Sequence, residues 1–213
     1  YIAVGDNGTI LTSPDAQTWT QQYCGTQEKL LSASYNKTTI VVGGNNGTYC
    51  SSQDGVQWAK SSSGSGRAVT SISTDSSMFV AVDGNTLLYS LDGASWSTST
   101  GITASGLLKP SFEAGIWIEL SSSGAVYQST DGMVWTGISS SSTLTTPSIH
   151  GFALHNNRLV RVDASGVIET ADLSASGPLA WVLQSSPSVP NLKKVVWADT
   201  AFVATMETEI EML

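Results

Sequence analysis

The sequence predicts an all-β protein, a β-propeller of four-stranded antiparallel blades, and three observations lead to this prediction. A motif of a serine, an aspartate two positions later and a tryptophan four positions after that occurs four times. The four tryptophans are 39, 38 and 39 residues apart, and a constant period of this length is typical of solenoids and propellers. No window has a useful apolar periodicity of 3.6 residues, so each repeat is expected to consist of strands.

Each repeat begins with two short β-rich runs on either side of a turn. In the first copy the runs are residues 1–4 and 9–12, and they flank Asp6-Asn7-Gly8. In the second copy Asn45-Asn46-Gly47 occupies the same place. Asn-Gly pairs accept the positive φ of a tight turn, so these segments predict β-hairpins.

Two more strands complete each predicted blade: an outer strand that starts at the tryptophan, and an inner strand after the following Ser/Thr-rich loop. Blades are then expected to begin near Leu30, Val69, Leu107, Ile149 and Lys193. We predict one propeller domain, residues 1–213, made of the repeats 1–29, 30–67, 68–106, 107–147, 148–191 and 192–213, of which the first and last are incomplete.

The two end repeats overlap in content instead of complementing each other. Both contain a second and a third strand, the trailing third strand being expected at 209–213. We therefore expect a segment of a longer polypeptide with about six blades, and five or seven blades are the alternatives.

The motif Ser-x-Asp-Gly-x-x-Trp resembles the Asp-box repeat of sialidase-like (BNR-type) propellers, of the kind found in bacterial surface and phage appendage proteins. The spacing is one residue shorter than in that family, Ala16 replaces the glycine in the first copy, and an insertion separates Asp172 from Trp181 in the fifth. The motif residues are Ser13, Asp15, Trp19, Ser52, Asp54, Gly55, Trp58, Ser90, Asp92, Gly93, Trp96, Ser129, Asp131, Gly132, Trp135, Asp172 and Trp181.

The motif has a structural explanation that needs no ligand. Short Ser and Asp side chains bond the backbone of their own turn, Gly tolerates a left-handed conformation, and Trp fills space between blades. A calcium site is the alternative, but one carboxylate per turn is too few for a cation that takes several oxygen ligands. We expect no metal and no cofactor.

Charge and composition restrict the possible partners. Nine Lys plus Arg residues, a formal net charge of −8 and no basic cluster larger than Lys193-Lys194 argue against nucleic acid and against an acidic membrane surface. No apolar segment is long enough to span a bilayer, so no membrane insertion is expected. Only 12% of residues are charged and the loops are rich in Ser, Thr, Gly and Asn, which predicts an extracellular or virion-surface protein.

Cysteine and histidine offer few candidates for chemistry. Cys24 and Cys50 permit one disulfide if the loop that carries Cys24 folds over the blade, but we favour free, partly buried thiols. His150 and His155 have no third ligand at zinc spacing and are expected to be ordinary loop or strand residues.

The resemblance to sialidases implies three arginines from different blades around a substrate carboxylate. This chain has only Arg67, Arg158 and Arg161, and the last two fall on one predicted strand at an odd spacing, so they face opposite sides of the sheet. The sequence therefore does not predict this arrangement.

A general glycosidase needs two carboxyl groups that face each other across the sugar. Glu113, Glu119 and Asp163 are candidates, but nothing in the sequence brings two of them together. We expect no enzymatic activity.

The outer-to-inner loops supply hydroxyls and amides but few aromatic groups, and Tyr23 is the main exception and a weak candidate for ligand binding. The leading hypothesis is a non-catalytic binding or display module of an extracellular or virion-surface assembly, such as a phage tail or a secreted surface protein. Its expected partners are proteins of that assembly and surface glycans. The alternative is a sialidase-like glycoside hydrolase whose catalytic residues lie partly in chain outside this sequence.

Overall fold

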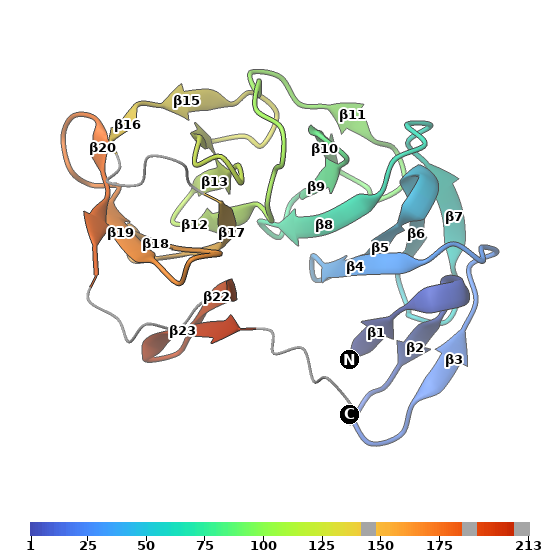
Figure 1. Cartoon of the computed structure of the whole chain (residues 1–213). Coiled ribbons are helices and arrows are strands. Elements are labelled where there is room, and N and C mark those ends of the chain that lie inside the picture. The colour runs from blue at the N-terminus through green and yellow to red at the C-terminus, as the bar shows by residue number, and fades with distance from the viewer. Residues whose placement is uncertain (142–147, 185–190, 207–213) are drawn as a thin grey trace. The chain divides into compact units, whose positions relative to one another are not determined.

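The computed structural model describes residues 1–141, 148–184 and 191–206, and the chain divides into two compact units. The first unit holds Tyr1–Ile102 and Asp131–Trp135, and the second holds Thr103–Thr130 and Thr136–Leu213. In both units the four-stranded sheets are antiparallel (Figure 1), which confirms the predicted all-β class.

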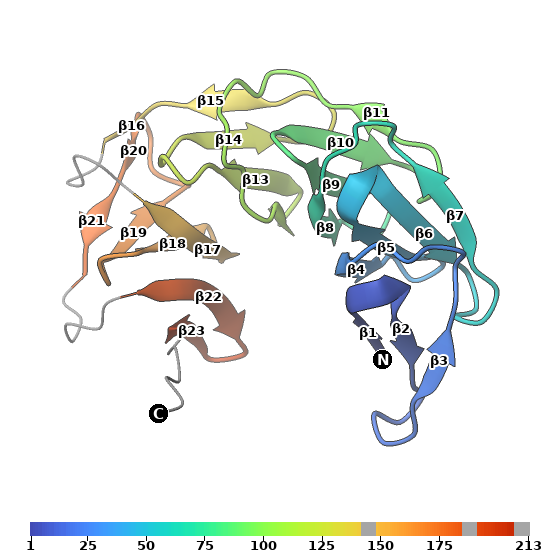
Figure 2. The ribbon, with the colours of Figure 1, turned by 45° about the vertical axis from the view of Figure 1, so that its right-hand side comes forward.

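The first unit contains a three-stranded sheet and two four-stranded blades. The first sheet has the order β1 (Ile2–Val4), β2 (Ile10–Thr12), β3 (Thr20–Gln22). The second blade has β4 (Leu30–Tyr35), β5 (Ile40–Gly44), β6 (Thr48–Ser52) and β7 (Ala59–Ser62). The third blade has β8 (Val69–Thr74), β9 (Phe79–Asp83), β10 (Thr86–Ser90) and β11 (Ser97–Thr98), which follow one another across the sheet in sequence order (Figure 2).

The predicted hairpin turns of the first two sheets are single 3₁₀ turns at Asp6–Gly8 and Asn45–Gly47. Asn7 and Asn46 both have a φ of 55°, the left-handed conformation that asparagine tolerates better than most residues. The Asn-Gly pairs therefore close the hairpins as the sequence predicts.

Successive sheets of the first unit pack through small apolar clusters. Val41 and Tyr49 of the second blade contact Val69, Ile72 and Phe79 of the third. All five side chains are at most 1% exposed. The hydrophobic faces that alternate along the strands are thus buried between neighbouring blades.

The prediction of free thiols is wrong: Cys24 and Cys50 form a disulfide with 6.1 Å between their Cα atoms. Cys24 follows β3 of the first sheet, and Cys50 lies on β6 of the second blade. Both are buried in the cluster that contains Ile10, Leu30 and Val42, so the loop after β3 folds over the blade as the pairing requires. The bond joins two sheets covalently.

The second unit contains two four-stranded blades and a final hairpin. The fourth blade has β12 (Ser111–Glu113), β13 (Ile116–Leu120), β14 (Val126–Ser129) and β15 (Thr136–Ile138). The fifth blade has β17 (Ile149–His155), β18 (Arg158–Asp163), β19 (Ile168–Asp172) and β21 (Val182–Leu183). The final hairpin pairs β22 (Leu192–Ala198) with β23 (Ala201–Met206).

Two details of the second unit differ from the sequence prediction. The fourth blade starts at Ser111, and Leu107, its predicted start, makes only an isolated bridge with Ser121. The insertion after Asp172 contains β20 (Leu179–Ala180), which pairs in parallel with β16 (Ser140–Ser141). The trailing strand predicted at 209–213 lies outside the described residues.

The core of the second unit combines apolar and charged side chains. Ile118 and Leu120 of β13 pack with Leu154 and Leu159 of the fifth blade. Beside them Arg161 and Glu169, at 1% and 0% side-chain exposure, form an ion pair with 2.6 Å between Nη2 and Oε2. No helix among the described residues is long and apolar enough to cross a membrane.

Candidate functional site

Each Ser-x-Asp turn is held by hydrogen bonds inside the turn. In the second blade Asp54 Oδ1 accepts the backbone N–H groups of Val56 (2.8 Å) and Gln57 (2.7 Å). Ser52 Oγ donates to the same oxygen (3.1 Å) and accepts the N–H of Gly55 (2.9 Å). These contacts satisfy backbone groups that no strand pairs, so the two side chains stabilise the turn without a ligand.

The same contacts keep the turn aspartates ionised. Backbone N–H groups of Ser95 and Ala94 lower the pKa of Asp92 to about 2. The pKa values of Asp15 and Asp54 are also lowered, chiefly by backbone N–H donors of their own turns. Hydrogen bonds to a carboxylate favour its charged form, so these turns present permanent negative charges at neutral pH.

The turn glycine also makes a close contact between blades. Gly93 has a φ of 76°, and a Cβ atom at this position would overlap the side chain of Val41 in the second blade. Ala16 has a φ of 61° in the first copy but lies in an exposed turn. At Gly93 both the backbone conformation and the contact with the neighbouring blade favour glycine, whereas the first turn has only the backbone conformation and accepts alanine.

The motif tryptophans become less exposed along the chain. Trp19 is 40% exposed and Trp135 only 2%. The indole N–H of Trp58 donates to Gly55 O (3.1 Å), and that of Trp135 donates to Gly132 O (3.0 Å). Trp96 instead stacks on Tyr49 of the second blade, with 4.1 Å between ring centroids. The tryptophans thus close their own turns and cover the junctions between sheets.

The fifth copy of the motif has a different role. Asp172 accepts hydrogen bonds from the backbone N–H and the hydroxyl of Ser174 (2.8 and 2.6 Å). Trp181, after the insertion, lies under the guanidinium of Arg161 at 3.9 Å from the ring centroid. Here the tryptophan supports a buried cation by a cation–π contact.

A groove opens between the Ser-x-Asp turns of the second and third blades, inside the first unit. Its volume is about 480 Å³, and residues from both blades line it. The lining side chains with hydrogen-bonding or aromatic groups include Thr39, Gln53, Asp54, Gln57, Trp58 and Asp92. This set combines two carboxylates, two amides, a hydroxyl and an indole, which is typical of a site for a polar ligand.

Much of the hydrogen-bonding capacity of the groove is unused. All hydrogen bonds of the Asp54 carboxylate in the described chain involve Oδ1, which leaves Oδ2 without one. The side-chain amides of Gln53 and Gln57 make no hydrogen bond to any described residue, and both residues are exposed. The groove can therefore donate to and accept from a ligand without breaking the turn.

The sequence does not predict this groove because it depends on the spacing of two turns that are 38 residues apart. In the sequence, the role of the aspartates in closing their turns is enough to explain why they occur in the motif. No sequence pattern distinguishes Gln53 or Gln57 as ligand-binding residues. Tyr23, the weak candidate, is 66% exposed after β3 and is not among the residues that line the groove.

Glu113 lies in a second cluster, in the second unit. Its Oε1 is 3.2 Å from His155 Nδ1 and accepts the N–H of Asn156 (2.9 Å). The His155 ring stacks on Trp197, with 4.0 Å between centroids, and Phe202 packs edge-on against Trp197 at 4.9 Å. His155 therefore links three successive sheets, whereas the sequence suggested an ordinary strand or loop residue.

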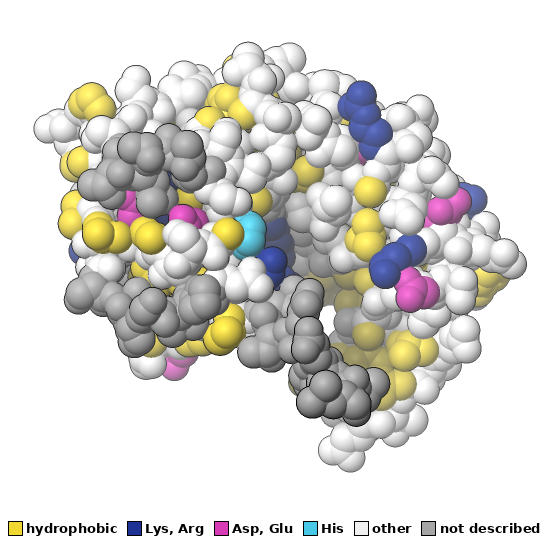
Figure 3. All heavy atoms as spheres, viewed as in Figure 1, with side chains coloured by type: hydrophobic (Ala, Val, Ile, Leu, Met, Phe, Trp, Pro, Cys, Tyr) yellow, Lys and Arg dark blue, Asp and Glu magenta, His cyan; other side chains and the backbone are white. Residues whose placement is uncertain are grey.

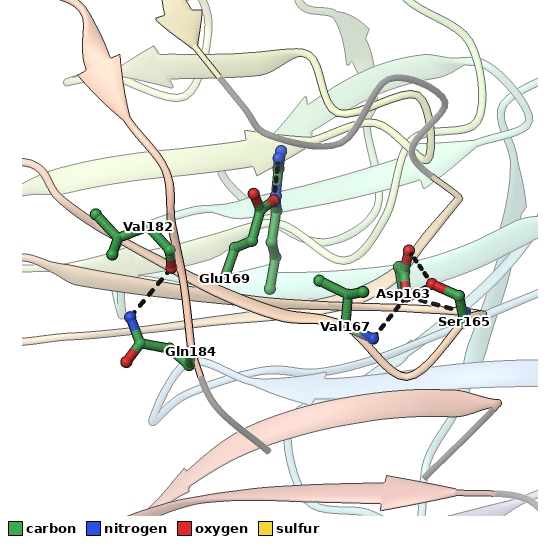
Figure 4. Close-up of polar contacts among 7 residues, drawn as sticks. Asp163, Ser165, Val167, Glu169, Val182 and Gln184 are labelled. Atoms are coloured by element: carbon green, nitrogen blue, oxygen red, sulfur yellow. Dashed lines mark hydrogen bonds and ion pairs between the residues drawn. The ribbon is translucent and has the colours of Figure 1, made fainter. Parts of the chain in front are cut away.

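The other two carboxylate candidates do not approach a substrate site. Glu119 is fully buried, with Oε1 accepting the N–H of Leu108 (2.7 Å) and Oε2 without a partner in the described chain. Burial raises its pKa well above the ordinary value. Asp163 accepts hydrogen bonds from Ser165 and from the backbone N–H of Val167, at the tip of its hairpin (Figure 4).

The described residues contain no group of three His, Cys, Asp or Glu side chains placed to hold a metal ion. In Figure 3 the charged side chains of the visible face occur singly or in small groups, with no extended basic patch. Arg161 is buried and paired with Glu169, so its guanidinium is not presented to a substrate carboxylate.

Comparisons with known proteins identify the fold and not a family. The chain is similar to the computationally designed Ika8 protein, with 16% identity, a TM-score of 0.73, and coverage of 95% of this chain and 64% of that one. YCF48 bound to D1 peptide has 17% identity and a TM-score of 0.62, and the match covers 92% of this chain and 64% of that one. The WD40 β-propeller domain of Doa1 has 15% identity and a TM-score of 0.62, and the match covers 91% of this chain and 68% of that one. The chain thus spans about two thirds of the length of these proteins.

These similarities confirm the predicted β-propeller fold, and at such low identity they carry only the fold. No protein-family model matches the sequence, and no curated protein matches it. The resemblance to the Asp-box family therefore stays a prediction.

Proposed function

We propose that this chain is a non-catalytic binding or display module of an extracellular or virion-surface assembly that makes contacts with proteins or glycans. The observation that carries this proposal is the groove between the second and third blades, whose two carboxylates are both held ionised. A groove of this kind can bind a polar ligand through fixed acceptors, because the turns are rigid before the ligand arrives.

The ionisation of Asp54 and Asp92 argues against glycoside hydrolysis in this groove. Hydrolysis needs one carboxyl group with a raised pKa that donates a proton to the leaving oxygen. Both groove aspartates have lowered pKa values instead. The described carboxyl group with a clearly raised pKa is that of Glu119, which is 0% exposed and cannot reach a ligand.

An extracellular or virion-surface location is supported by the disulfide. The bond between Cys24 and Cys50 is of a kind that persists in oxidising compartments and is rare in the cytosol. The low proportion of charged residues and the hydroxyl-rich loops agree with that setting.

Binding to a protein partner is supported by one structural neighbour. YCF48, a chain of the same fold, has been solved with D1 peptide bound. At 17% identity this is an example of what the fold permits, and it supports a contact role for this chain without naming its partner.

The test compares turnover with binding in the same preparation. The chain is incubated with a panel of polysaccharides and aryl glycosides while reducing ends are measured, and it is also applied to a glycan array and to immobilised extracellular protein fractions. We expect binding to at least one class and no release of reducing ends. Release that disappears in the Asp54→Asn or Asp92→Asn variant would overturn the proposal in favour of a hydrolase.

A further inference from the structure

We propose that the groove between the second and third blades is a binding site for neutral oligosaccharides, with Asp54 and Gln57 as its main hydrogen-bonding residues. This inference rests on the proposed binding function and adds the ligand class and the residues. The motif turn would then serve two purposes: Oδ1 of its aspartate closes the turn, and Oδ2 is free for a ligand.

The chemistry of the lining selects hydroxyl groups. A sugar hydroxyl both donates and accepts, and the groove offers acceptors on Asp54 and Asp92 beside amides that do both on Gln53 and Gln57. Trp58 adds an indole, whose amphipathic surface suits the C–H groups of a sugar. Hydrogen bonds from a hydroxyl to a carboxylate are charge-assisted and are stronger than those to neutral acceptors.

Charge excludes several other ligands. Two permanent carboxylates repel phosphates, sulfates and acidic sugars, and no Lys or Arg lines the groove to neutralise them. A resident calcium ion needs more oxygen ligands than two carboxylates provide, and the described chain holds no cluster of three acidic or His/Cys residues.

A basic peptide is the strongest competing ligand, because a Lys or Arg side chain would pair with Asp54 and Asp92. Such a cation has donors only, so it pairs with the carboxylates but offers no acceptor to the amide N–H groups of Gln53 and Gln57. An oligosaccharide can satisfy donors and acceptors together. The volume of about 480 Å³ falls within the range of about 300–1,000 Å³ that is usual for small-ligand sites.

The first turn provides matched controls. Asp15 and Thr18 occupy the positions of Asp54 and Gln57 and make the same turn contacts, since Asp15 Oδ1 accepts the N–H groups of Gln17 and Thr18 at 2.8 Å. Neither residue lines the groove. An Asp→Asn change keeps the Oδ1 acceptor at both turns and removes the negative charge, so the two variants differ only in proximity to the groove.

The experiment uses the whole chain on an array of neutral and acidic oligosaccharides, followed by calorimetry with the neutral oligosaccharide that gives the strongest signal. We expect Asp54→Asn and Gln57→Ala to weaken its binding at least tenfold, and Asp15→Asn and Thr18→Ala to change it less than twofold. Indole N–H resonances in ¹⁵N spectra should show that the ligand perturbs Trp58.

Four outcomes would overturn the inference. Unchanged oligosaccharide binding in both groove variants would place the ligand elsewhere, and the proposed binding function would stand. Binding only to a Lys/Arg-rich peptide would identify a protein partner at this site. Loss of oligosaccharide binding in EDTA would show that a cation is the primary ligand. If no neutral oligosaccharide binds, this inference fails. Binding to the immobilised extracellular protein fractions then still decides the proposed function. Should Asp54→Asn disturb folding, Gln57→Ala carries the test alone.

Discussion

The two units of the chain bury their charged side chains in different ways. In the first unit the motif carboxylates lie at the surface, and the buried Asp83 receives hydrogen bonds from Ser65 on Oδ1 (2.6 Å) and from Ser63 on Oδ2 (2.5 Å). The second unit buries the pair Arg161–Glu169 and also Glu119, one oxygen of which has no partner in the described chain. The same repeat therefore accepts both apolar and charged junctions between sheets.

This difference in buried side chains shows which part of a blade determines the fold. The blades of both units are antiparallel ladders in sequence order, whereas the side chains between sheets differ in polarity. Since main-chain hydrogen bonds define a blade by themselves, the packing positions can vary as long as volume is filled and buried polar atoms are paired. Glu119 is the exception to this pairing.

The largest effect is expected from breaking the buried ion pair of the second unit. Glu169→Ala leaves the Arg161 guanidinium buried without its carboxylate partner, which should lower the free energy of unfolding by about 3–5 kcal/mol. Urea denaturation followed by tryptophan fluorescence measures this loss. The double variant Arg161→Met/Glu169→Leu is the control and should recover most of it, because no unpaired charge remains. A loss below about 1 kcal/mol for Glu169→Ala would show that the pair is not a stabilising element of this core.

Removal of the disulfide tests the apolar junction of the first unit. Cys24→Ser/Cys50→Ser opens a link between residues 26 apart in sequence and should cost about 3.5 kcal/mol through the entropy of the unfolded chain. The measurement is the urea midpoint of the variant beside that of the oxidised and the reduced wild type. If reduction leaves the midpoint unchanged, the packing around Ile10 and Leu30 holds the two sheets together without the bond.

The close contact at Gly93 is expected to matter about as much as the disulfide. Gly93→Ala combines a left-handed backbone strain of about 1–2 kcal/mol with an overlap against Val41 of about 1–3 kcal/mol. Gly64, which has a φ of 74° and open space where a Cβ would lie, is the matched control, and Gly64→Ala should show only the first cost. Equal losses of unfolding free energy in the two variants would mean that the blades move apart easily at this turn.

The smallest effect concerns the pH dependence of the free energy of unfolding, to which the turn carboxylate of Asp92 and the buried carboxyl group of Glu119 contribute with opposite signs. The pKa of Asp92 falls from 3.8 to about 2 on folding, so its stabilising contribution is present above pH 3.8 and is lost as the pH falls towards 2. The pKa of Glu119 is raised above 4.5, so stability decreases as the pH rises above 4.5, by at most about 1.4 kcal/mol per pH unit.

The measurement is the free energy of unfolding between pH 2 and 8. We expect the combined stabilising contribution of Asp92 and Glu119 to be largest near pH 4. Glu119→Gln should remove the decline on the neutral side and leave the acid side unchanged. Asp92→Asn should reduce the loss on the acid side without removing it, because the pKa values of Asp15 and Asp54 are lowered too, and should leave the neutral side unchanged. A Glu119→Gln profile identical to the wild type would show that Glu119 is ionised in the folded chain, contrary to its buried and half-partnered state.

Most of the fold could be predicted from the sequence because its signals are local and repeated. The Asn-Gly pairs at Asn7 and Asn46 define hairpins within a few residues, and the constant tryptophan spacing defines the repeat. The fourth blade, expected to begin near Leu107, has its first regular strand at Ser111, while Leu107 already pairs with Ser121 through an isolated bridge. The sequence locates this start only within a few residues, because an apolar residue indicates a strand without showing where regular pairing begins.

The candidate groove could not be predicted, because its residues come from turns of two blades and their distance is a property of packing. The turn contacts of Asp54 are enough to explain its identity, and only the structure shows that one oxygen remains unused. The same holds for Cys24 and Cys50, whose pairing requires a loop to fold across a neighbouring sheet.

By itself, the sequence determined the strands, the hairpin turns, the repeat length and hence the propeller fold, because each depends on residues close together in the chain. The tertiary structure alone decided the disulfide, the buried pair of Arg161 and Glu169, the contact of Glu113 with His155, and the groove beside Asp54. The disulfide, the Glu113–His155 contact and the groove join different sheets, so they depend on how sheets pack, which no local pattern encodes. Arg161 and Glu169 lie opposite each other on β18 and β19 of one blade, so their contact depends on the register of those two strands.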